Sequence, residues 1–505
     1  MAGRRSRCRR RRKVRRRIVA AAAGVAILIA AAAGWAYWFF SGDGFRRALE
    51  SEATAWIGVP VHIGAAGARF LPRLAVELRD VRVGDPARLT LARLELAADL
   101  RALLAGRIEN ADVLVSNSGI DMPLPFSLPE PRDANAAGAA LPPVRIVSIR
   151  SIALRDVRLR SRGREIVVSA ESALNGATLA LRRFDAETGQ TRLTANGVVE
   201  LSPRVDARVN ATANRLDMDE LLALAAAFTP EPADDRAAGP GARISAGITA
   251  AEATAGTVRM RQFATDLTVD GDTIALNHLD FKMFSGRYEG SASARLSAPL
   301  SATLEARIAD LDVAELAAFG GAPDTITGRL SGAGTFTGSG ADVAQLMRRA
   351  RGNATASIVD GSIKRLRLVR TVVLFFGRPA PQAEEATDHF DRLDATFSLA
   401  TRILHAQTFS LRSTDADMVG TGTLSLDTDA LNGRADVMLS ERLSAQAGTD
   451  LYRYAREGNR VVLPASIGGT LAAPRLTIDA AAAVRRGLRN EFERRMKDLL
   501  EGLGR

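Results

Sequence analysis

Apolar and polar residues alternate with a period of two through most of the chain after about residue 60. Leu74, Val76 and Leu78 form one such run. Because successive side chains of a β-strand point to opposite faces, this period is typical of strands with one apolar face. Further runs are Phe397 with Leu399, Phe409 with Leu411, Leu424 with Leu426, and Val437 with Leu439. About twenty such segments, with few helical spacers for parallel βαβ units, predict a mainly β fold.

One turn and one internal repeat indicate how the strands connect and bend. Asp270-Gly271 lies between two apolar runs and predicts a hairpin. The segment Leu78-Arg-Asp-Val-Arg-Val83 recurs as Leu154-Arg-Asp-Val-Arg-Leu159, and in both copies the apolar phase slips by one residue. A β-bulge at Arg79-Asp80 and at Arg155-Asp156 would absorb the extra residue and bend the strand. We therefore expect a long, curved antiparallel sheet.

Helical spacing of apolar residues is rarer and predicts a few flanking helices. The predicted helices are Phe45–Ile57, Asp99–Ala105, Asp219–Phe228, Asp342–Arg351, Lys364–Phe376 and Ala480–Leu503. The last carries an apolar stripe that includes Leu488, Phe492 and Met496, with arginines off the stripe. Capping of a sheet end is the default interpretation of such a helix, and contact with a membrane or a partner stays open.

The excess of positive charge lies entirely at the start of the chain. The sequence holds 68 Lys and Arg against 57 Asp and Glu, and residues 1–17 contain eleven of these cations and no acid. Residues 18–40 follow without a charge and are long enough, at about 1.5 Å per residue, for a transmembrane helix. Since positive charge stays on the cytoplasmic side, we expect a cytoplasmic tail and a body outside the cytoplasm from about residue 41.

Two other interpretations of this region are less favoured. A cleaved signal peptide would have an apolar stretch of about 7–15 residues, whereas this one runs on into Trp35, Tyr37 and Trp38. A DNA-binding arm is the alternative for the tail, but attraction to anionic lipids of the inner leaflet fits a tail that adjoins a membrane span. The single cysteine, Cys8, lies in this tail, so the body is expected to hold no disulfide.

We expect no catalytic, metal or cofactor site in the body. The four histidines have no metal-ligand spacing, and no nucleophile-elbow motif occurs; they are His62, His278, His389 and His405. The glycines of Gly332–Gly338 lack phosphate-loop spacing and predict a hairpin followed by a helix cap. Aromatic residues make up only 5% of the chain, which disfavours nucleic-acid and glycan binding. What remains is an aliphatic face suited to alkyl chains.

Several segments resemble the AsmA family of inner-membrane-anchored periplasmic proteins of Gram-negative bacteria. The segments are Trp56–Ile63, Phe70–Val81, Ile358–Ile363, Gly420–Leu426 and Pro464–Pro474. The resemblance implies a groove-like β-sheet related to bridge-like lipid-transfer proteins, with phospholipid transport towards the outer membrane and outer-membrane homeostasis as its role. It implies no enzymatic activity. Assembly of outer-membrane proteins, through envelope protein partners, and an unrecognised envelope enzyme stay open as alternatives.

The expected organisation follows from these signals. The predicted regions are a basic tail (1–17), a transmembrane helix (18–40), an N-terminal AsmA-like β region (43–120), a Pro-rich linker (121–143), a middle β-repeat region (144–320), a C-terminal AsmA-like β region (321–479) and an amphipathic helix (480–505). Candidates for a lipid-lining face are Leu279, Phe281, Met283, Leu424, Leu426, Val437 and Leu439. The expected ligands are phospholipid acyl chains.

Overall fold

The computed structural model describes most of the body of the chain. The described residues are 43–69, 73–99, 107–124, 145–202, 204–228, 242–363, 388–445, 455–470, 472–479, 481–482, 485–489, 492 and 496. The predicted tail, the predicted transmembrane helix and the predicted helix at 364–376 lie outside them, as does nearly all of 99–105 and of the Pro-rich linker. Within the described residues, no helix is both long and apolar enough to cross a bilayer.

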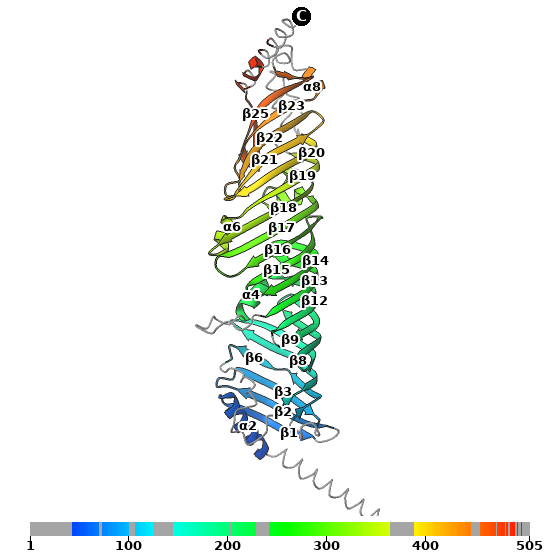
Figure 1. The fold of residues 1–505 in the computed structure, drawn as a ribbon, viewed down its shortest axis with the longest axis vertical. Coiled ribbons are helices and arrows are strands. Elements are labelled where there is room, and N and C mark those ends of the chain that lie inside the picture. Colours follow the sequence, from blue (N-terminus) through cyan, green and yellow to red (C-terminus); the bar gives the residue numbers. More distant parts are fainter. Residues whose placement is uncertain are drawn as a thin grey trace, which may run out of the picture. The chain divides into compact units, whose positions relative to one another are not determined.

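The described residues confirm the mainly β prediction (Figure 1). Twenty-four strands take part in extended sheet pairing, and β4 (Arg107–Ile108) and β7 (Arg145–Ile146) form a separate two-stranded sheet. The chain divides into two compact units, which are described in turn. Unit 1 comprises residues up to Arg243 with Thr254–Gly256, and unit 2 comprises Ile244–Ala253 and the residues from Thr257 onward.

Unit 1 begins with a helix and continues with strands. Its remaining elements are α2 (Asp43–Ile57), β1 (Val61–Arg69), β2 (Leu74–Val83), β3 (Leu89–Ala98), β5 (Ala111–Ser116), β6 (Gly119–Met122), β8 (Ser148–Ser161), β9 (Arg164–Asn175), β10 (Thr178–Thr188), β11 (Thr191–Glu200), β12 (Asp206–Asp217) and α4 (Met218–Phe228). Helices α2 and α4 confirm the predictions at 45–57 and 219–228. Leu49, Ala53 and Ile57 of α2 pack on a buried cluster in β1 and β2.

The purely antiparallel prediction was wrong in unit 1. Strands β5 and β6 both pair with β8 in parallel, with Val115 opposite Leu154. Tight hairpins force antiparallel pairing, but the chain reaches β8 from β6 through residues 123–147, which is long enough for a crossover. The sheet is therefore mixed.

Unit 2 is built from long strands and short helices. Its elements are β13 (Arg243–Ala255), β14 (Val258–Asp270), β15 (Thr273–Met283), β16 (Gly286–Arg295), β17 (Leu300–Asp312), α5 (Val313–Phe319), β18 (Ile326–Gly340), α6 (Val343–Arg348), β19 (Arg351–Ile363), β20 (Asp388–Ala400), β21 (Ile403–Arg412), β22 (Ala416–Ser425), β23 (Leu431–Leu439), α8 (Glu441–Ala445), β24 (Arg456–Glu457), β25 (Arg460–Thr470) and β26 (Ala473–Ile478). From β14 to β26, neighbouring strands pair antiparallel. The hairpin predicted at Asp270-Gly271 is confirmed between β14 and β15.

Bulges recur along both units, and most hold a residue with a left-handed backbone. The bulge predicted at Arg155-Asp156 is confirmed by a register shift between Leu154 and Val157. The bulge predicted at Arg79-Asp80 was wrong, because the register of β1 and β2 is the same on both sides of Asp80. One residue lies between the flanking pairs on each strand, Gly64 on β1 and Asp80 on β2, so neither strand carries an extra residue. Asp80 nevertheless has a left-handed backbone, with a φ of 52°.

The glycines of Gly332–Gly338 lie inside β18, so the predicted hairpin there was wrong. They make room on the sheet surface: a Cβ on Gly334 would lie 3.0 Å from the Phe336 ring, and one on Gly352 of β19 would lie 2.4 Å from it. The aromatic ring therefore lies over bare backbone of two strands. The predicted helix cap does follow, since the Asp342 side chain accepts a hydrogen bond from the Gln345 amide at 2.6 Å and begins α6.

Candidate functional site

Strand pairing in unit 2 aligns apolar residues into rows that cross the sheet. Directly opposed residues of paired strands share one face, so a chain of partners traces a row on that face. Row one crosses from β15 to β26 as Phe281, Tyr288, Ile308, Gly332, Ala356, Ala395, Phe409, Gly420, Ala435, Ala465 and Ile478. Apart from the Tyr288 hydroxyl, no member of this row carries a polar side-chain group.

Two further rows lie on the same face. Row two is Leu267, Leu276, Ala292, Leu304, Phe336, Gly352, Leu399, Leu404, Leu424 and Leu431. Row three is Leu311, Leu330, Ile358, Leu393, Leu411, Met418, Val437 and Leu463. We call the surface formed by these three rows the apolar face of unit 2.

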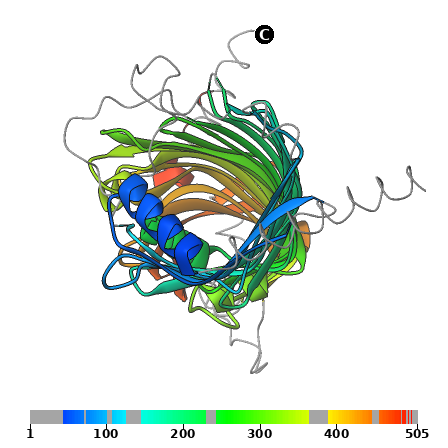
Figure 2. The same cartoon turned by 90° about the horizontal axis from the view of Figure 1, so that it is seen from below.

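The strands that carry these rows bend along their length. In Figure 2 the strands of unit 2, coloured green to orange, run as arcs. Register shifts interrupt several of their pairings, as between Ile308 and Leu311. Bulges increase local twist and bend a strand, so they account for part of this curvature.

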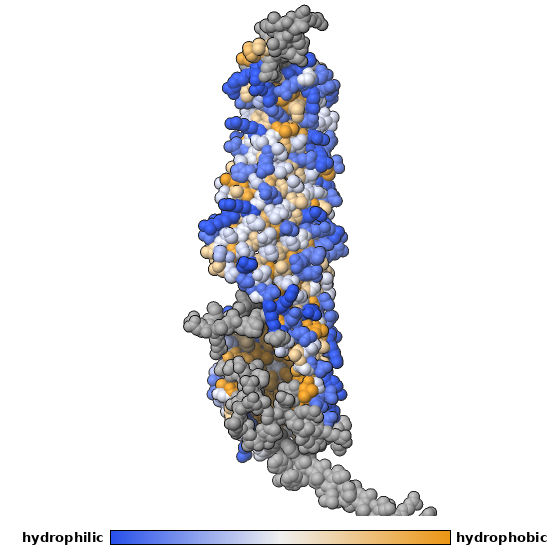
Figure 3. Space-filling model, viewed as in Figure 1, coloured by the Kyte–Doolittle hydropathy of each residue, from blue (hydrophilic) through white to orange (hydrophobic). Residues whose placement is uncertain are grey.

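Unit 1 has an apolar row of its own. Its members, from β1 to β12, are Ala66, Leu78, Leu94, Val115, Leu154, Ala170, Phe184, Ala195 and Ala211. Figure 3 shows that the visible side of unit 1 is hollowed near β3 and β6, with apolar residues inside the hollow. Both units thus repeat one design, in which apolar residues of successive strands line up across the sheet.

The sequence-predicted candidates all belong to or adjoin the apolar face of unit 2. Phe281, Leu424 and Val437 are members of rows one, two and three. Leu279 pairs with Gly290, Met283 with Gly286, and Leu439 with Ala416, all at neighbouring positions on this face. Leu426 directly follows β22 and is 40% exposed.

Burial divides these candidates into two groups. Val437 and Leu439 have no exposed surface and lie in a closed cluster with Val461 and Leu463. Phe281 is also buried, since its ring stacks on Tyr288 with centroids 4.5 Å apart and lies 6.3 Å from Phe263. Row two is more open: Leu304 is 38% exposed, and its neighbours Phe336, Leu399, Leu404 and Leu424 are half-buried. An acyl chain would therefore find accessible surface along row two.

Sequence reasoning missed most of row two, namely Leu276, Leu304, Phe336, Leu404 and Leu431. Their period-two alternation is visible in the sequence, but alternation alone cannot say which strands are neighbours or in which register they pair.

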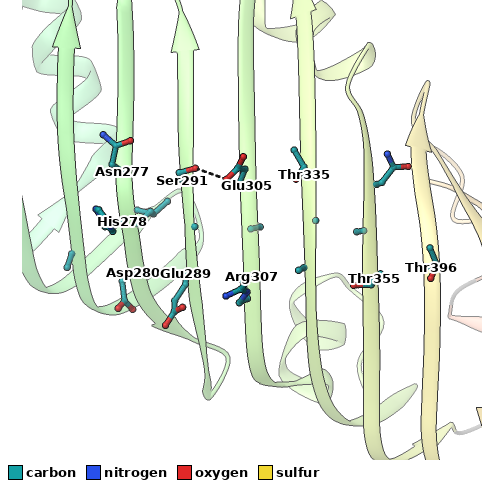
Figure 4. A pocket seen from close by; sticks show the side chains of 18 residues that line it. Asn277, His278, Asp280, Glu289, Ser291, Glu305, Arg307, Thr335, Thr355 and Thr396 are labelled. Carbon is teal, nitrogen blue, oxygen red and sulfur yellow. Dashed lines mark hydrogen bonds between the residues drawn. The ribbon is translucent and has the colours of Figure 1, made fainter.

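The opposite face of unit 2 is polar. A hollow of about 1160 Å³ is lined by polar side chains from two rows on that face, by the small residues between those rows, and by Leu279 (Figure 4). Ser291 and Glu305 form one hydrogen bond there at 3.5 Å. Arg287 donates from Nε to Asp280 at 3.1 Å and thereby lowers the pKa of that carboxyl. These side chains are therefore paired with one another at the surface of the sheet.

The histidines are placed as surface residues. All four are exposed, and His278 Nδ1 lies 3.1 Å from an Asp266 carboxylate oxygen. Over the part of the chain that the structure describes, no three His, Cys, Asp or Glu residues converge as metal ligands.

Comparison with known proteins gives one match. Residues 225–407, from within α4 to within β21, match the model of the AsmA family. This stretch includes Ile358–Ile363 and a large part of rows one and two. No curated protein and no solved structure matches the chain.

Proposed function

Since residues 225–407 identify the chain as a member of the AsmA family, we propose that it carries phospholipid acyl chains along the apolar face of its sheet. In this proposal the protein is anchored in the inner membrane by residues 18–40, its body lies in the periplasm, and lipid moves towards the outer membrane. The role is one of transport and envelope homeostasis, without a catalytic step.

The observation that carries the proposal is the continuity of the apolar rows. Row one crosses eleven consecutive partners without a charged or amide side chain. Row two runs beside it on the same face and is more open, so the two rows together offer an alkyl chain a continuous apolar surface with an accessible edge.

Energetics favour such a path. Each CH₂ group that leaves an apolar phase for water costs about 0.8 kcal/mol, so a sixteen-carbon chain costs on the order of 12 kcal/mol. A half-buried apolar row removes much of this cost while leaving the polar headgroup in water. Leu304 and Leu424, which are partly exposed in row two, supply surface of this kind.

The test is site-specific crosslinking in the full chain. A photoreactive side chain at Leu424 lies on the apolar face, whereas one at Thr423 lies on the polar face of the same strand. We expect lipid adducts, identified by mass spectrometry, at position 424 and a background level at 423. Equal labelling at both positions, or none at 424 in folded protein, would reject the proposal.

A further inference from the structure

Helix α6 lies on the apolar face of unit 2, at one edge of the sheet (Figure 1). It follows β18, whose residues Gly338 and Gly340 share the face of Phe336 in row two. A Cβ on Gly338 would lie 3.1 Å from Leu346 Cδ2, and one on Gly340 would lie 2.6 Å from the Leu346 amide nitrogen. Because these glycines carry no side chain, α6 rests directly on the strand, and Gly338 is only about 7 Å beyond Phe336.

Two other apolar side chains of α6 remain in solvent while Leu346 rests on the sheet. Val343 and Met347 are four residues apart, so they lie on one side of the helix, and they are 68% and 59% exposed. The connection from β16 to β17 reaches the same edge, since the start of β17 pairs with the end of β18, and its Leu296 is 55% exposed. Accessible apolar surface is therefore found both in row two and at the adjoining edge of the sheet.

Positive charge lies directly beside these apolar side chains. Arg348 and Arg349 follow the exposed pair in sequence, and Arg351 begins β19. All three side chains are exposed, and within the part of the chain that the structure describes no hydrogen bond or ion pair engages their guanidinium groups. The one acid between residues 341 and 351, Asp342, caps the start of the helix. The guanidinium groups at this edge are therefore available to an anionic ligand.

A phospholipid carries the two groups that match this edge, an alkyl chain and a phosphate. Arg guanidinium groups bind phosphate oxygens through charge-assisted hydrogen bonds. Row two carries no polar side chain, so the headgroup of a lipid whose alkyl chain lies there has to stay in water at the edge of the sheet. A second copy of this chain would bring the arginines of two edges together, which disfavours self-association.

We propose that the edge formed by α6 holds the phosphate of a phospholipid whose acyl chain enters row two. Arg348 and Arg349 bind the phosphate, and Val343 and Met347 cover the first methylene groups of the chain. The inference rests on the proposed function and deepens it, because it names the place where the headgroup is recognised. A lipid that lacks phosphate should be held less well at this edge, although its alkyl chain fits row two equally.

Photocrosslinking at the edge tests the site in the full chain. A photoreactive side chain replaces Met347, and the protein in non-ionic detergent is given phosphatidylglycerol or a diacylglycerol with the same acyl chains. We expect the phosphatidylglycerol adduct to exceed the diacylglycerol adduct at least about threefold, and Arg348→Gln/Arg349→Gln to lose about this factor. The control, Arg259→Gln/Arg261→Gln, removes two exposed arginines from β14, four strands away from β18 in the sheet. It should give as much adduct as the chain with both arginines.

Each other outcome counts against the headgroup site. Equal labelling by the two lipids would overturn it, as would unchanged labelling of the Arg348→Gln/Arg349→Gln variant. An adduct with the mass of a second copy would assign the exposed apolar pair to self-association instead. Crosslinking at Leu424, measured with the same lipids, separates this site from the transport function. Adducts at position 424 without adducts at 347 reject the edge site alone, whereas adducts at 347 without any at 424 reject transport along the apolar face.

Discussion

Side chains on the apolar face of unit 2 differ in how far they are closed off from solvent. Leu439 has no exposed surface, whereas Leu426 keeps 40% of its own. Period-two alternation gives both residues the same sequence signature, because the alternation reports which face a side chain occupies and not what covers that face. Candidate lining residues could therefore be predicted from the sequence as a set, but their division into closed core and accessible surface could not.

Truncation should expose this division. We expect Leu439→Ala to lower the free energy of unfolding by about 2–5 kcal/mol, because the cavity lies in a closed cluster. Leu426→Ala should cost under about 1 kcal/mol, since little buried area is lost. Urea unfolding of the two variants measures both values. Equal costs would show that Leu426 is covered in solution.

Tyr288 predicts a pH dependence of stability at alkaline pH. Burial raises the pKa of its hydroxyl above the ordinary value of about 10. In the alkaline range the unfolded state therefore loses this proton before the folded state does, so the free energy of unfolding falls as pH rises above about 10. Tyr288→Phe keeps the ring stacked on Phe281 and removes the ionisation. We expect the variant to lose less stability between pH 9 and about 11, as measured by urea unfolding; parallel curves would contradict this.

At the scale of elements, left-handed residues set the direction of the following side chain. Asp156 and Asp310 have φ values of 52° and 54°, and the residues after them, Val157 and Leu311, are buried. The two sites also share a hydrogen bond: the amide of Asp156 donates to Ser169 Oγ, and that of Asp310 to Ser331 Oγ, each at 3.1 Å. A bulge of this kind lets a strand change phase without exposing its next apolar residue.

These bulges show what the sequence can and cannot specify. The phase slip at Arg155-Asp156 was readable and confirmed, because one strand alone carries the extra residue. The slip at Arg79-Asp80 looked the same, yet Gly64 on the partner strand cancels it. Helices α2 and α4 were readable from their apolar spacing, whereas α5 is only seven residues long and begins at a cap formed by Asp312. A bulge that a partner strand cancels, or a short helix that one cap begins, leaves no periodic pattern of apolar residues in the sequence.

Asp310 tests the requirement for a left-handed residue. Asp310→Val should lower the free energy of unfolding by about 1–2 kcal/mol, because a β-branched side chain is strained at positive φ. Asp310→Asn should be near neutral, since Asn tolerates this conformation. Thermal or urea unfolding of the pair is the measurement. If Val and Asn cost the same, the backbone at this position is not left-handed in solution.

At the scale of the whole molecule, the excess positive charge and the apolar rows lie in different parts of the sequence. Residues 1–17 hold the entire excess of cations, and the apolar rows lie in strands from β1 to β26. This order fits a chain that is anchored at its start and offers apolar surface over the rest of its length. The anchor is testable independently of lipid.

Reporter fusions test the orientation. A reporter active only outside the cytoplasm should work when fused after Gly44 and stay silent when fused at residue 10, because positively charged segments that adjoin a membrane span stay on the cytoplasmic side. The measurement is reporter activity in intact cells, with immunoblots as the control for expression. Activity at both points, or release of a soluble body by cleavage near Ala33, would contradict a retained anchor.

Blocking row two tests whether the apolar face is a path or only a core. Leu304 is 38% exposed in the middle of the row, so an ionised side chain at this position can reach water and the fold should survive Leu304→Glu. The charge would nevertheless interrupt the row between Ala292 and Phe336. We expect folded, exported protein that fails to rescue an outer-membrane permeability defect and gives less lipid adduct at Leu424.

The matched control is Thr303→Glu, one residue earlier on β17 and on the polar face, opposite Ser293 and Thr337. It adds the same charge to the same strand, so a general effect on folding or export would appear in both variants. Rescue by Thr303→Glu and failure of Leu304→Glu, at equal protein levels, would tie function to one face of the sheet. An alkyl chain that passes a charged side chain leaves CH₂ groups in water, and each of them costs about 0.8 kcal/mol. If Leu304→Glu nevertheless rescues as well as the unaltered chain, lipid does not move along the apolar rows past this position.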